Sequence, residues 1–507
     1  MMATRPRLIF IALIVCAILF WTLLGIFDFI KVEIDRNIDG HVRSNSPPFP
    51  DDRFHHLFWV VQISDIHVSR FHDPKRVPDF TRLLEEDLKV IDPHLVLATG
   101  DLTDAKSLDG IGSTQYKDEW QQYRDALQKS GVLKWTKWLD VRGNHDAFNV
   151  AELKSDSNMF RTHSVKGREE QYNYIENVHI DGSTYSFVAM DACPKPGPKR
   201  PFNFFGVLSN ESLTELEELS RQTKNSNMTI WFGHYPTSVI VSPYPGVRHF
   251  MRGATAYLCG HLHTLAGLVP NMYTMQKSGG LELELGDWKD NRKFRVLAID
   301  HDLMSFTDVS LDDWPIILVT NPKHALFTTP LHEPTGRIRQ SSHIRILVFS
   351  NSDVESVTVS LDGKYHGLAV SSWKPLYVLP WQPSDFSTGV HEIEVTVKDI
   401  LGNEKTIKQP FSVDNTKLSF DVLPRMILMA NMASVMQVLF GAVYIVYMSV
   451  MLTLRFYWRH IAISASLPSC LVNCLKVWST RLCMLANTDK IFYPLMIFNI
   501  YIAVGSN

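Results

Sequence analysis

Aspartate, histidine and asparagine side chains, which can bind metal ions, gather in five short segments of the chain. In chain order the segments are Asp65-Ile66-His67, Gly100-Asp101, Gly143-Asn144-His145-Asp146, Gly233-His234 and Gly260-His261-Leu262-His263. Carboxylate and imidazole groups bind divalent transition metals. Two such metals, about 3.5–4 Å apart, are a standard device for attacking a phosphate ester. The five segments together therefore indicate a two-metal phosphoesterase site.

Short hydrophobic stretches come directly before four of these segments and predict the strands that position them. The stretches are residues 58–63, 95–98, 138–141 and 229–232. Residues 80–91 and 116–127 carry apolar side chains at helical spacing, so strands and helices alternate. Ligands of α/β sheets gather outside the carboxyl ends of the strands, so we expect the segments to converge on one crevice. The adjacent glycines let the backbone turn sharply and approach the metals closely.

An all-β pattern replaces this alternation from about residue 334 to 413. Its longer stretches alternate with period two, and Asp362-Gly363 is a hairpin signal. A series of short strands of this length predicts an immunoglobulin-like sandwich, in which we expect Trp373 to be a core residue. No constellation of reactive groups occurs there, so spacing or protein contact is the expected role. We place the α/β domain at residues 57–330 and the immunoglobulin-like domain at residues 331–420.

An apolar run near the N-terminus predicts a membrane helix. Residues 8–27 are long enough to span a bilayer. Basic residues precede the run and acidic residues follow it, which places the N-terminus in the cytosol and the body in the lumen or outside the cell. We therefore assign residues 1–30 as a transmembrane signal anchor and residues 31–56 as a linker. A cleaved signal peptide is the alternative.

The C-terminal part of the chain, residues 421–507, is also predicted to be a membrane region. Residues 435–454 form a second apolar span, residues 455–490 a basic loop that is expected to be cytosolic, and residues 491–504 a partial third span. The protein is therefore expected to be a multi-pass membrane protein.

Charge, cysteines and sequons restrict the class of protein further. The net charge is −3, with 50 basic and 53 acidic residues, which argues against nucleic-acid binding. Asn210 and Asn227 begin glycosylation sequons and fit a lumenal glycoprotein. Cys193 and Cys259 could pair in an oxidising compartment, but Cys259 ends an apolar stretch, which favours a free buried thiol.

As an ordered set, the five segments resemble the calcineurin-like metallophosphoesterase superfamily, with its motifs D-x-H, G-D, G-N-H-[DE], G-H and G-H-x-H. The resemblance covers about residues 57–311. It implies a layered β-sandwich flanked by helices and a metal-dependent phosphoric ester hydrolase. With the other features, it predicts this α/β fold followed by the immunoglobulin-like domain and transmembrane helices.

The resemblance also implies which residues bind two metal ions. One ion would be bound by Asp65, His67, Asp101 and His263. The other ion would be bound by Asp101, Asn144, His234 and His261. Asp101 would bridge the ions, because a carboxylate has two oxygens. Mixed imidazole and oxygen ligands suit Mn, Fe or Zn.

The same resemblance assigns the catalytic roles. A hydroxide that bridges the metals would attack phosphorus, and His145 would act as general acid at the leaving oxygen. Asp146 would orient and stabilise the His145 imidazolium. Arg142 could pair with phosphate or cover the sheet edge, and Asp191 has no role in the motifs.

Departures from related patterns narrow the substrate. Serine/threonine protein phosphatases of this superfamily resemble G-D-x-V-D-R-G, whereas residues 100–106 read GDLTDAK and lack the arginine. Purple acid phosphatases carry a metal-bound tyrosine where Asp104 stands. Phosphomonoesters and phosphodiesters of small molecules, lipids or glycans are left as substrates, and membrane attachment favours the lipid-linked ones.

A second hypothesis is a catalytically inactive membrane protein that uses the fold as a metal-stabilised binding or scaffold module. A degenerate enzyme usually loses metal ligands, and this chain retains a residue of the expected type at every motif position. The sequence therefore favours the enzyme.

Overall fold

The computed structural model describes residues 44–457 and 481–505 of the 507-residue chain. The chain divides after Asn431 into two compact units, which are described separately. The predicted span at residues 8–27 and residues 458–480 of the predicted basic loop lie outside the described residues.

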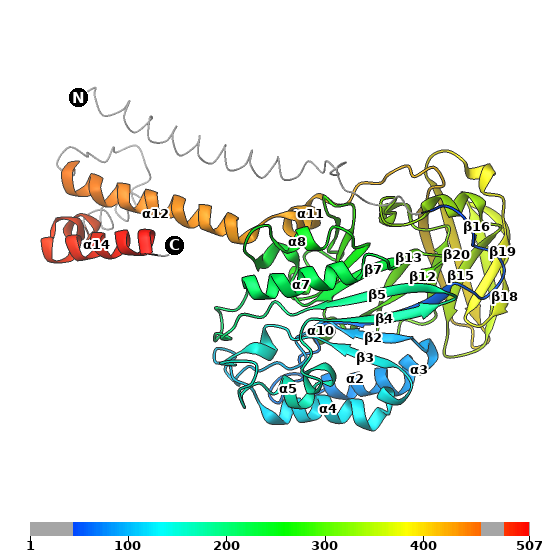
Figure 1. Cartoon of the computed structure of the whole chain (residues 1–507), viewed down its shortest axis with the longest axis horizontal. Coiled ribbons are helices and arrows are strands. Elements are labelled where there is room, and N and C mark those ends of the chain that lie inside the picture. Colours follow the sequence, from blue (N-terminus) through cyan, green and yellow to red (C-terminus); the bar gives the residue numbers. More distant parts are fainter. Residues whose placement is uncertain (1–43, 458–480, 506–507) are drawn as a thin grey trace, which may run out of the picture. The chain divides into compact units, whose positions relative to one another are not determined.

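Two β-sheets lie at the centre of the first part of this unit (Figure 1). The first sheet has the order β13-β12-β1-β2-β3 and consists of β1 (Leu57–Ile63), β2 (Leu95–Ala98), β3 (Lys137–Asp140), β12 (Lys293–Asp300) and β13 (Leu303–Ser310). The second has the order β10-β11-β9-β7-β5-β4 and consists of β4 (Tyr174–Ile180), β5 (Ser183–Met190), β7 (Met228–Gly233), β9 (Ala256–Cys259), β10 (Tyr273–Met275) and β11 (Leu281–Glu284). Parallel strands β1, β2 and β3 in one sheet and β5, β7, β9 and β11 in the other confirm the predicted α/β alternation.

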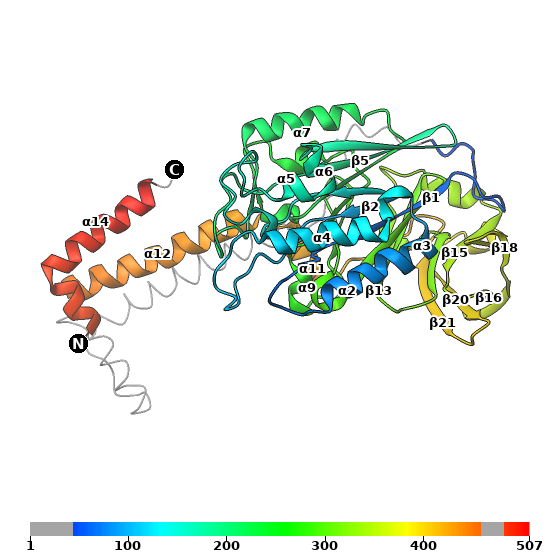
Figure 2. The same ribbon diagram turned by 90° about the horizontal axis from the view of Figure 1, so that it is seen from below.

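Both faces of the first sheet are buried. Phe58 and Val60 point into the core between the two sheets, whereas Trp59 and Val61 point to the opposite face, because side chains alternate along a strand. Helices cover that face, and α2 and α4 lie side by side there (Figures 1 and 2). The helices of this domain include α2 (Arg76–Arg82), η1 (Leu83–Asp87), α3 (Leu88–Ile91), α4 (Lys117–Ser130) and, packed on β5, α7 (Asn210–Gln222). The domain is thus a β-sandwich with helices on both outer faces.

An immunoglobulin-like sandwich of two four-stranded sheets follows. Its sheets have the orders β14-β15-β19-β18 and β17-β16-β20-β21. The strands are β14 (Ile316–Asn321), β15 (His343–Phe349), β16 (Val354–Leu361), β17 (Lys364–Leu368), β18 (Val370–Trp373), β19 (Leu376–Pro380), β20 (His391–Asp399) and β21 (Glu404–Phe411). The all-β prediction is confirmed.

Two details of that prediction are corrected by the structure. The sandwich begins earlier than residue 331, because β14 pairs with β15 along the full length of that strand. Trp373 is 69% exposed and is not a core residue. Trp381 takes that place, and its indole nitrogen donates a hydrogen bond to the Ser341 hydroxyl.

The two domains of the first unit share a buried polar interface. Asp300, at the end of β12, forms an ion pair with Arg345 of β15 at 2.8 Å, and both side chains are inaccessible to solvent. Lys323 and Glu333 form a second buried pair, in which Glu333 also accepts a hydrogen bond from the Met304 backbone of β13. Breaking a buried pair costs about 3–5 kcal/mol, so the sandwich is fastened to the α/β domain.

The second unit consists of helices. Its described residues include the helices α12 (Met432–Tyr457) and α14 (Asp489–Gly505), and residues 481–487 are also helical. Among the described residues, one helix, Met432–Phe456, is long and apolar enough to cross a membrane, and it covers the predicted span at residues 435–454. The predicted partial span at residues 491–504 lies in α14, a helix of 17 residues with Pro494 inside it.

Candidate metal centre

All five sequence segments lie at the carboxyl ends of strands. Asp65 follows β1, Asp101 follows β2 and Asn144 follows β3, all in the first sheet. His234 and His261 follow β7 and β9 in the second sheet. Asp101 Oδ1 lies 3.4 Å from His234 Nε2, so the strand ends of the two sheets meet. The convergence on one place that the strand pattern predicts is confirmed.

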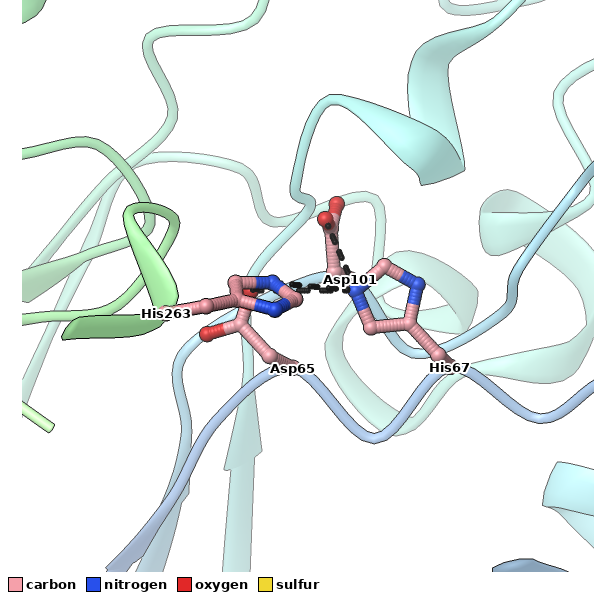
Figure 3. Close-up of side chains that lie close together, drawn as sticks. All are labelled: Asp65, His67, Asp101 and His263. Atoms are coloured by element: carbon pink, nitrogen blue, oxygen red, sulfur yellow. Dashed lines mark hydrogen bonds and ion pairs between the residues drawn. The ribbon is translucent and has the colours of Figure 1, made fainter. Parts of the chain in front are cut away.

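A first cluster contains Asp65, His67, Asp101 and His263 (Figure 3), whose ligand atoms all lie within 4.8 Å of one another. His67 Nε2 is 3.4 Å from Asp101 Oδ2 and 3.3 Å from His263 Nε2. His263 Nε2 is 3.0 Å from Asp65 Oδ1. Two atoms that each lie about 2.1 Å from one metal are themselves about 3–3.5 Å apart in a tetrahedral site. The spacing of this cluster therefore fits a metal ion.

A second cluster contains Asp101, Asn144, His234 and His261. The Asn144 Oδ1 atom lies 2.9 Å from His234 Nε2 and 2.9 Å from His261 Nδ1. The two imidazole nitrogens lie 3.1 Å apart. Asp101 turns Oδ1 toward this cluster and Oδ2 toward the first. The seven residues thus form two adjacent ligand sets that share one carboxylate.

The hydrogen bonds around the clusters set which imidazole nitrogen faces the centre. His67 Nδ1 donates to Asp104 Oδ1 at 3.2 Å, which leaves Nε2 free to bind a metal. His234 Nδ1 donates to the Thr99 carbonyl at 3.0 Å, and His261 Nε2 to the Phe204 carbonyl at 2.9 Å. Metal-binding histidines almost always donate their other N–H in this way. The hydrogen bonds made by the other ring nitrogens therefore support the same metal ligands as the distances between the ligand atoms.

Burial lowers the pKa of His67, His234 and His261 and so favours the neutral imidazoles that metals require. It lowers the pKa of His67 to about 3 and holds the pKa of His261 well below its ordinary value. Burial also raises the pKa of Asp101, and the charges of Asp65 and Asp146 raise it further. A cation between these groups would reverse that effect, because it favours the ionised carboxylate.

The backbone at the centre is strained. Five of the seven candidate ligands have a left-handed backbone, with φ of 55° at Asp65, 49° at His67, 52° at Asp101, 82° at His261 and 51° at His263. This conformation costs a non-glycine residue about 1–2 kcal/mol. Such residues cluster at functional sites, where the surrounding structure enforces them. The strain therefore indicates that ligand placement outweighs local stability here.

Two glycines allow the motif loops to approach one another. A Cβ atom on Gly143 would lie 2.1 Å from Asp101 Oδ1, and one on Gly260 would lie 2.3 Å from Asp65 Oδ2. No side chain can occupy either position without displacing a candidate ligand. These glycines therefore allow the loops that carry the candidate ligands to pack directly against one another.

We expect Gly143→Ala to weaken metal binding, because the new methyl group must push the shared carboxylate aside. A misplaced ligand shell typically costs about 10–100-fold in metal affinity or activity. The measurement is metal titration of the purified full chain. Gly253→Ala is the control, since a Cβ there meets nothing within 4 Å. Equal affinity in the two variants would contradict this role of Gly143.

His145 lies beside both clusters, and its partner differs from the one predicted. His145 Nδ1 donates to the Asp104 carbonyl at 2.5 Å, and Nε2 faces Asp101 Oδ2 at 3.8 Å. The Asp146 carboxylate instead accepts backbone N–H groups of Leu102, Thr103 and Gly143. The prediction that Asp146 orients the His145 imidazole is wrong, because these backbone donors occupy both of its oxygens. Asp146 ties together the two loops that carry Asp101 and Asn144.

The sequence motifs did not identify the role of Asp104 or the partner of Arg142. Asp104 accepts the hydrogen bond from His67, and its position three residues after Asp101 was the available signal. Arg142 and Asp191 form a buried ion pair with Nη2 and Oδ2 2.5 Å apart, a partner that the motifs did not indicate. Cys193 lies beside this pair and donates to the Gly143 carbonyl at 3.2 Å. Cys193 and Cys259 are both buried and free, as expected.

Comparison with known proteins places this geometry in a family. Residues 58–265 match the model of the calcineurin-like phosphoesterases, and residues 311–417 match that of the TMEM62 Ig-like domain. The chain is 46% identical over 410 residues to Transmembrane protein 62 of Mus musculus, in an alignment that covers 81% of this chain and 64% of that protein. It is 30% identical over 439 residues to a protein of Arabidopsis thaliana named as a metallophosphoesterase, with 71% and 58% covered. The chain thus spans less than two-thirds of the length of either relative.

Among solved structures, the purple acid phosphatase PPD1 of yellow lupin (Lupinus luteus) is similar with a TM-score of 0.35 and 13% identity, over 52% of this chain and 53% of that one. The two family matches together cover both domains of the first unit, and they confirm the resemblance on which the site assignment rests. Residues 58–265 thus form a calcineurin-like phosphoesterase domain, and residues 311–417 form a TMEM62 Ig-like domain.

Proposed function

We propose that this chain is a membrane-anchored phosphoesterase with two metal ions, which hydrolyses a phosphomonoester or a phosphodiester. The observation that carries the proposal is the position of Asp101, whose two oxygens lie 3.4 Å from His67 Nε2 and 3.4 Å from His234 Nε2. One carboxylate between two sets of metal-facing nitrogens is the arrangement of a two-metal hydrolase. The complete ligand set gives no support to the inactive scaffold.

The roles follow from these contacts. Asp65, His67 and His263 would complete one metal site, and Asn144, His234 and His261 the other, with Asp101 shared. Mn, Fe or Zn in these sites would lower the pKa of a bound water and neutralise charge on the phosphate. The Nε2 atom of His145 would deliver a proton to the leaving oxygen, because its Nδ1 atom is already committed to the Asp104 carbonyl.

The loops around the site support an amphiphilic, lipid-linked substrate. Ile111, Phe202 and Leu268 are 79%, 80% and 81% exposed. Ile111 and Leu268 lie on loops that follow a site segment, and Phe202 lies on a loop that contacts a site segment. Arg200 joins two of these loops through the Gly110 carbonyl. On the loop that also carries Ile111, the Lys106 ammonium lies 3.3 Å from Asp104. A phosphate near the metals with an apolar tail on the three exposed apolar side chains would match both features.

We further propose the predicted topology, with the N-terminus cytosolic, several spans and the phosphoesterase domain in the lumen or outside the cell. The apolar helix α12 and the similarity to Transmembrane protein 62 support membrane attachment. Asn210 is exposed at the start of α7 and is the better glycan acceptor, since Asn227 Oδ1 accepts the Thr184 backbone N–H. A full chain that carries no glycosidase-sensitive sugar in a glycosylating cell would contradict the lumenal placement.

The test of function is a substrate screen on the full chain in detergent, loaded with manganese. We expect turnover of aryl phosphate monoesters or diesters, with Asp101→Asn as the blank. Absence of metal from the purified protein, together with no turnover under several divalent ions, would contradict the proposal and favour the scaffold.

Substitution of an exposed apolar residue on a loop near the site tests whether the substrate is linked to a lipid. We expect Phe202→Ser to lower kcat/KM for a long-chain lipid phosphate in mixed micelles roughly tenfold, because a phenyl group loses about 1.5–3 kcal/mol of burial. Turnover of a water-soluble aryl phosphate should not change. Leu401→Ser, at an equally exposed leucine of the immunoglobulin-like domain, is the control. An equal effect of Phe202→Ser on both substrates would contradict the lipid-binding role.

A further inference from the structure

A second group of side chains that can bind a metal lies at the opposite end of the first sheet. It consists of Asp51, His55 and His301, whose ligand atoms lie within 4.8 Å of one another. His55 comes two residues before β1, and His301 directly follows β12, whose Asp300 pairs with Leu57. Asp65 lies beyond the other end of β1. Seven strand residues at about 3.3 Å each place the two sites roughly 20 Å apart.

His301 is the buried member of this group. Its side chain is inaccessible to solvent, and Nδ1 donates a hydrogen bond to Asp300 Oδ1 at 2.6 Å. Its Nε2 atom is buried and has no hydrogen-bond partner among the described residues. A buried polar atom without a partner costs about 1–3 kcal/mol. A carboxylate on one nitrogen and a free lone pair on the other is the arrangement of a metal-binding histidine.

Asp300 is itself held in place. Its other oxygen accepts hydrogen bonds from Arg345 Nε at 2.8 Å and from the Thr320 hydroxyl at 2.6 Å. The orientation of the His301 ring is therefore set by the polar interface between the two domains. Such rigid support of a ligand favours metal binding, because little side-chain entropy is lost.

The other two members of the group are accessible to solvent. The His55 ring centroid lies 5.0 Å from that of His301, and His55 Nδ1 is 3.6 Å from Asp51 Oδ1. The side chains of His55 and Asp51 are 24% and 21% exposed, so an ion can reach them. Arg53 pairs with the other oxygen of Asp51, and its own side chain is 72% exposed. The Arg53 guanidinium can thus remain on Oδ2, and Oδ1, which accepts the Arg53 backbone N–H at 2.9 Å, keeps a second lone pair for an ion.

We propose that Asp51, His55 and His301 bind one divalent cation of the zinc class, in addition to the pair at the phosphoesterase centre. Two imidazoles and one carboxylate are a ligand set that suits zinc and leaves a fourth position for water. The ion would fasten the segment that enters the body to the end of β12. This segment also accepts hydrogen bonds from Arg345 through the carbonyls of Asp51 and Arg53.

The test is a count of zinc ions bound per full-length chain, by equilibrium dialysis and elemental analysis. It is run in an Asp101→Asn background, so that the phosphoesterase centre contributes equally to every sample. We expect His55→Ala to bind one zinc ion fewer per chain. His366→Ala, at an exposed histidine of the immunoglobulin-like domain, should bind the same number as the background. Equal counts for His55→Ala and the background would overturn the proposal.

Two further measurements separate this site from folding defects and from the phosphoesterase centre. In the Asp101→Asn background, zinc should raise the thermal midpoint more than it does in the same background with His55→Ala, because an ion that binds only the folded state stabilises it. In the otherwise unchanged chain, His55→Ala should keep the aryl phosphatase activity. Zinc that raises both thermal midpoints equally would also overturn the proposal. The zinc count and the thermal shift are read without turnover, so failure of the phosphoesterase proposal would leave both intact.

Discussion

Asp101→Asn is expected to abolish phosphoesterase activity and to weaken both metal sites at once. Asp101 is the only one of the seven candidate ligands that faces both clusters, at 3.4 Å from an imidazole nitrogen of each. An amide has one oxygen and no charge, so it can neither bridge two cations nor neutralise them. Loss of a single charge-stabilising group costs about 10²–10³-fold in kcat, and we expect a loss at least that large. Metal analysis and aryl phosphate turnover of the full chain measure it.

The fold of this variant should survive. Asparagine has nearly the shape of aspartate and can still accept the His145 backbone N–H, which lies 2.8 Å from Oδ1. Burial and the charges of Asp65 and Asp146 raise the pKa of Asp101, so removal of its charge should not destabilise the metal-free protein. Asp156→Asn, at an exposed aspartate, is the matched control. Full metal content with full activity in Asp101→Asn would contradict the bridging role.

His145→Ala is expected to lower turnover by about 10²–10⁴-fold for alkyl phosphate esters, the usual contribution of a general acid. The Nε2 atom of His145 lies 3.8 Å from Asp101 Oδ2, at the edge of both ligand clusters. Alkoxide leaving groups need a proton, whereas a nitrophenolate leaves without one. The loss should therefore be much smaller for nitrophenyl phosphate. Steady-state rates on the two ester classes measure the difference.

The metal content of His145→Ala shows whether His145 acts as a general acid or as a metal ligand. The His145 side chain donates its hydrogen bond to the Asp104 carbonyl and approaches Asp101 only to 3.8 Å, so His145→Ala should keep both metals. Asp146→Asn tests the corrected role of Asp146, since its carboxylate accepts only backbone N–H groups and a hydroxyl from the adjoining loops. That variant should lose stability without a change in leaving-group dependence. Equal losses on alkyl and aryl esters in His145→Ala would contradict its assignment as acid.

The parts of the fold that local pattern dictates could be predicted from the sequence. Apolar stretches such as residues 58–63 became the parallel strands, and Asp92 and Gly131 end helices as backbone rules require. The glycines in four of the five motif segments predicted close approach of the backbone, and the Cβ distances at Gly143 and Gly260 show how close the loops come. Seven candidate ligands could be named because the motif set resembles that of the calcineurin-like metallophosphoesterases, and the strand pattern predicted that their segments converge.

The contacts that depend on tertiary packing could not be predicted. Asp146 is next to His145 in sequence, but the turn points its carboxylate at backbone N–H groups. The partner of Arg142 is Asp191, which is 49 residues away and carries no motif. Likewise, His55 and His301 are separated by most of the α/β domain, and only the pairing of β1 with β12 brings them together. Such pairs depend on strand order, which a single sequence does not fix.

The central claim is that two metals share Asp101, and the most direct measurement is the electron paramagnetic resonance spectrum of the full chain loaded with Mn²⁺. Mn²⁺ at the proposed third site, roughly 20 Å from the centre, would add the signal of an isolated ion and leave the coupled signal in place. Two Mn²⁺ ions about 3.5–4 Å apart and bridged by a carboxylate are magnetically coupled. The account predicts a coupled spectrum in the wild-type chain and its loss in Asp101→Asn. A wild-type spectrum that contains only isolated Mn²⁺ ions at saturating metal would contradict it.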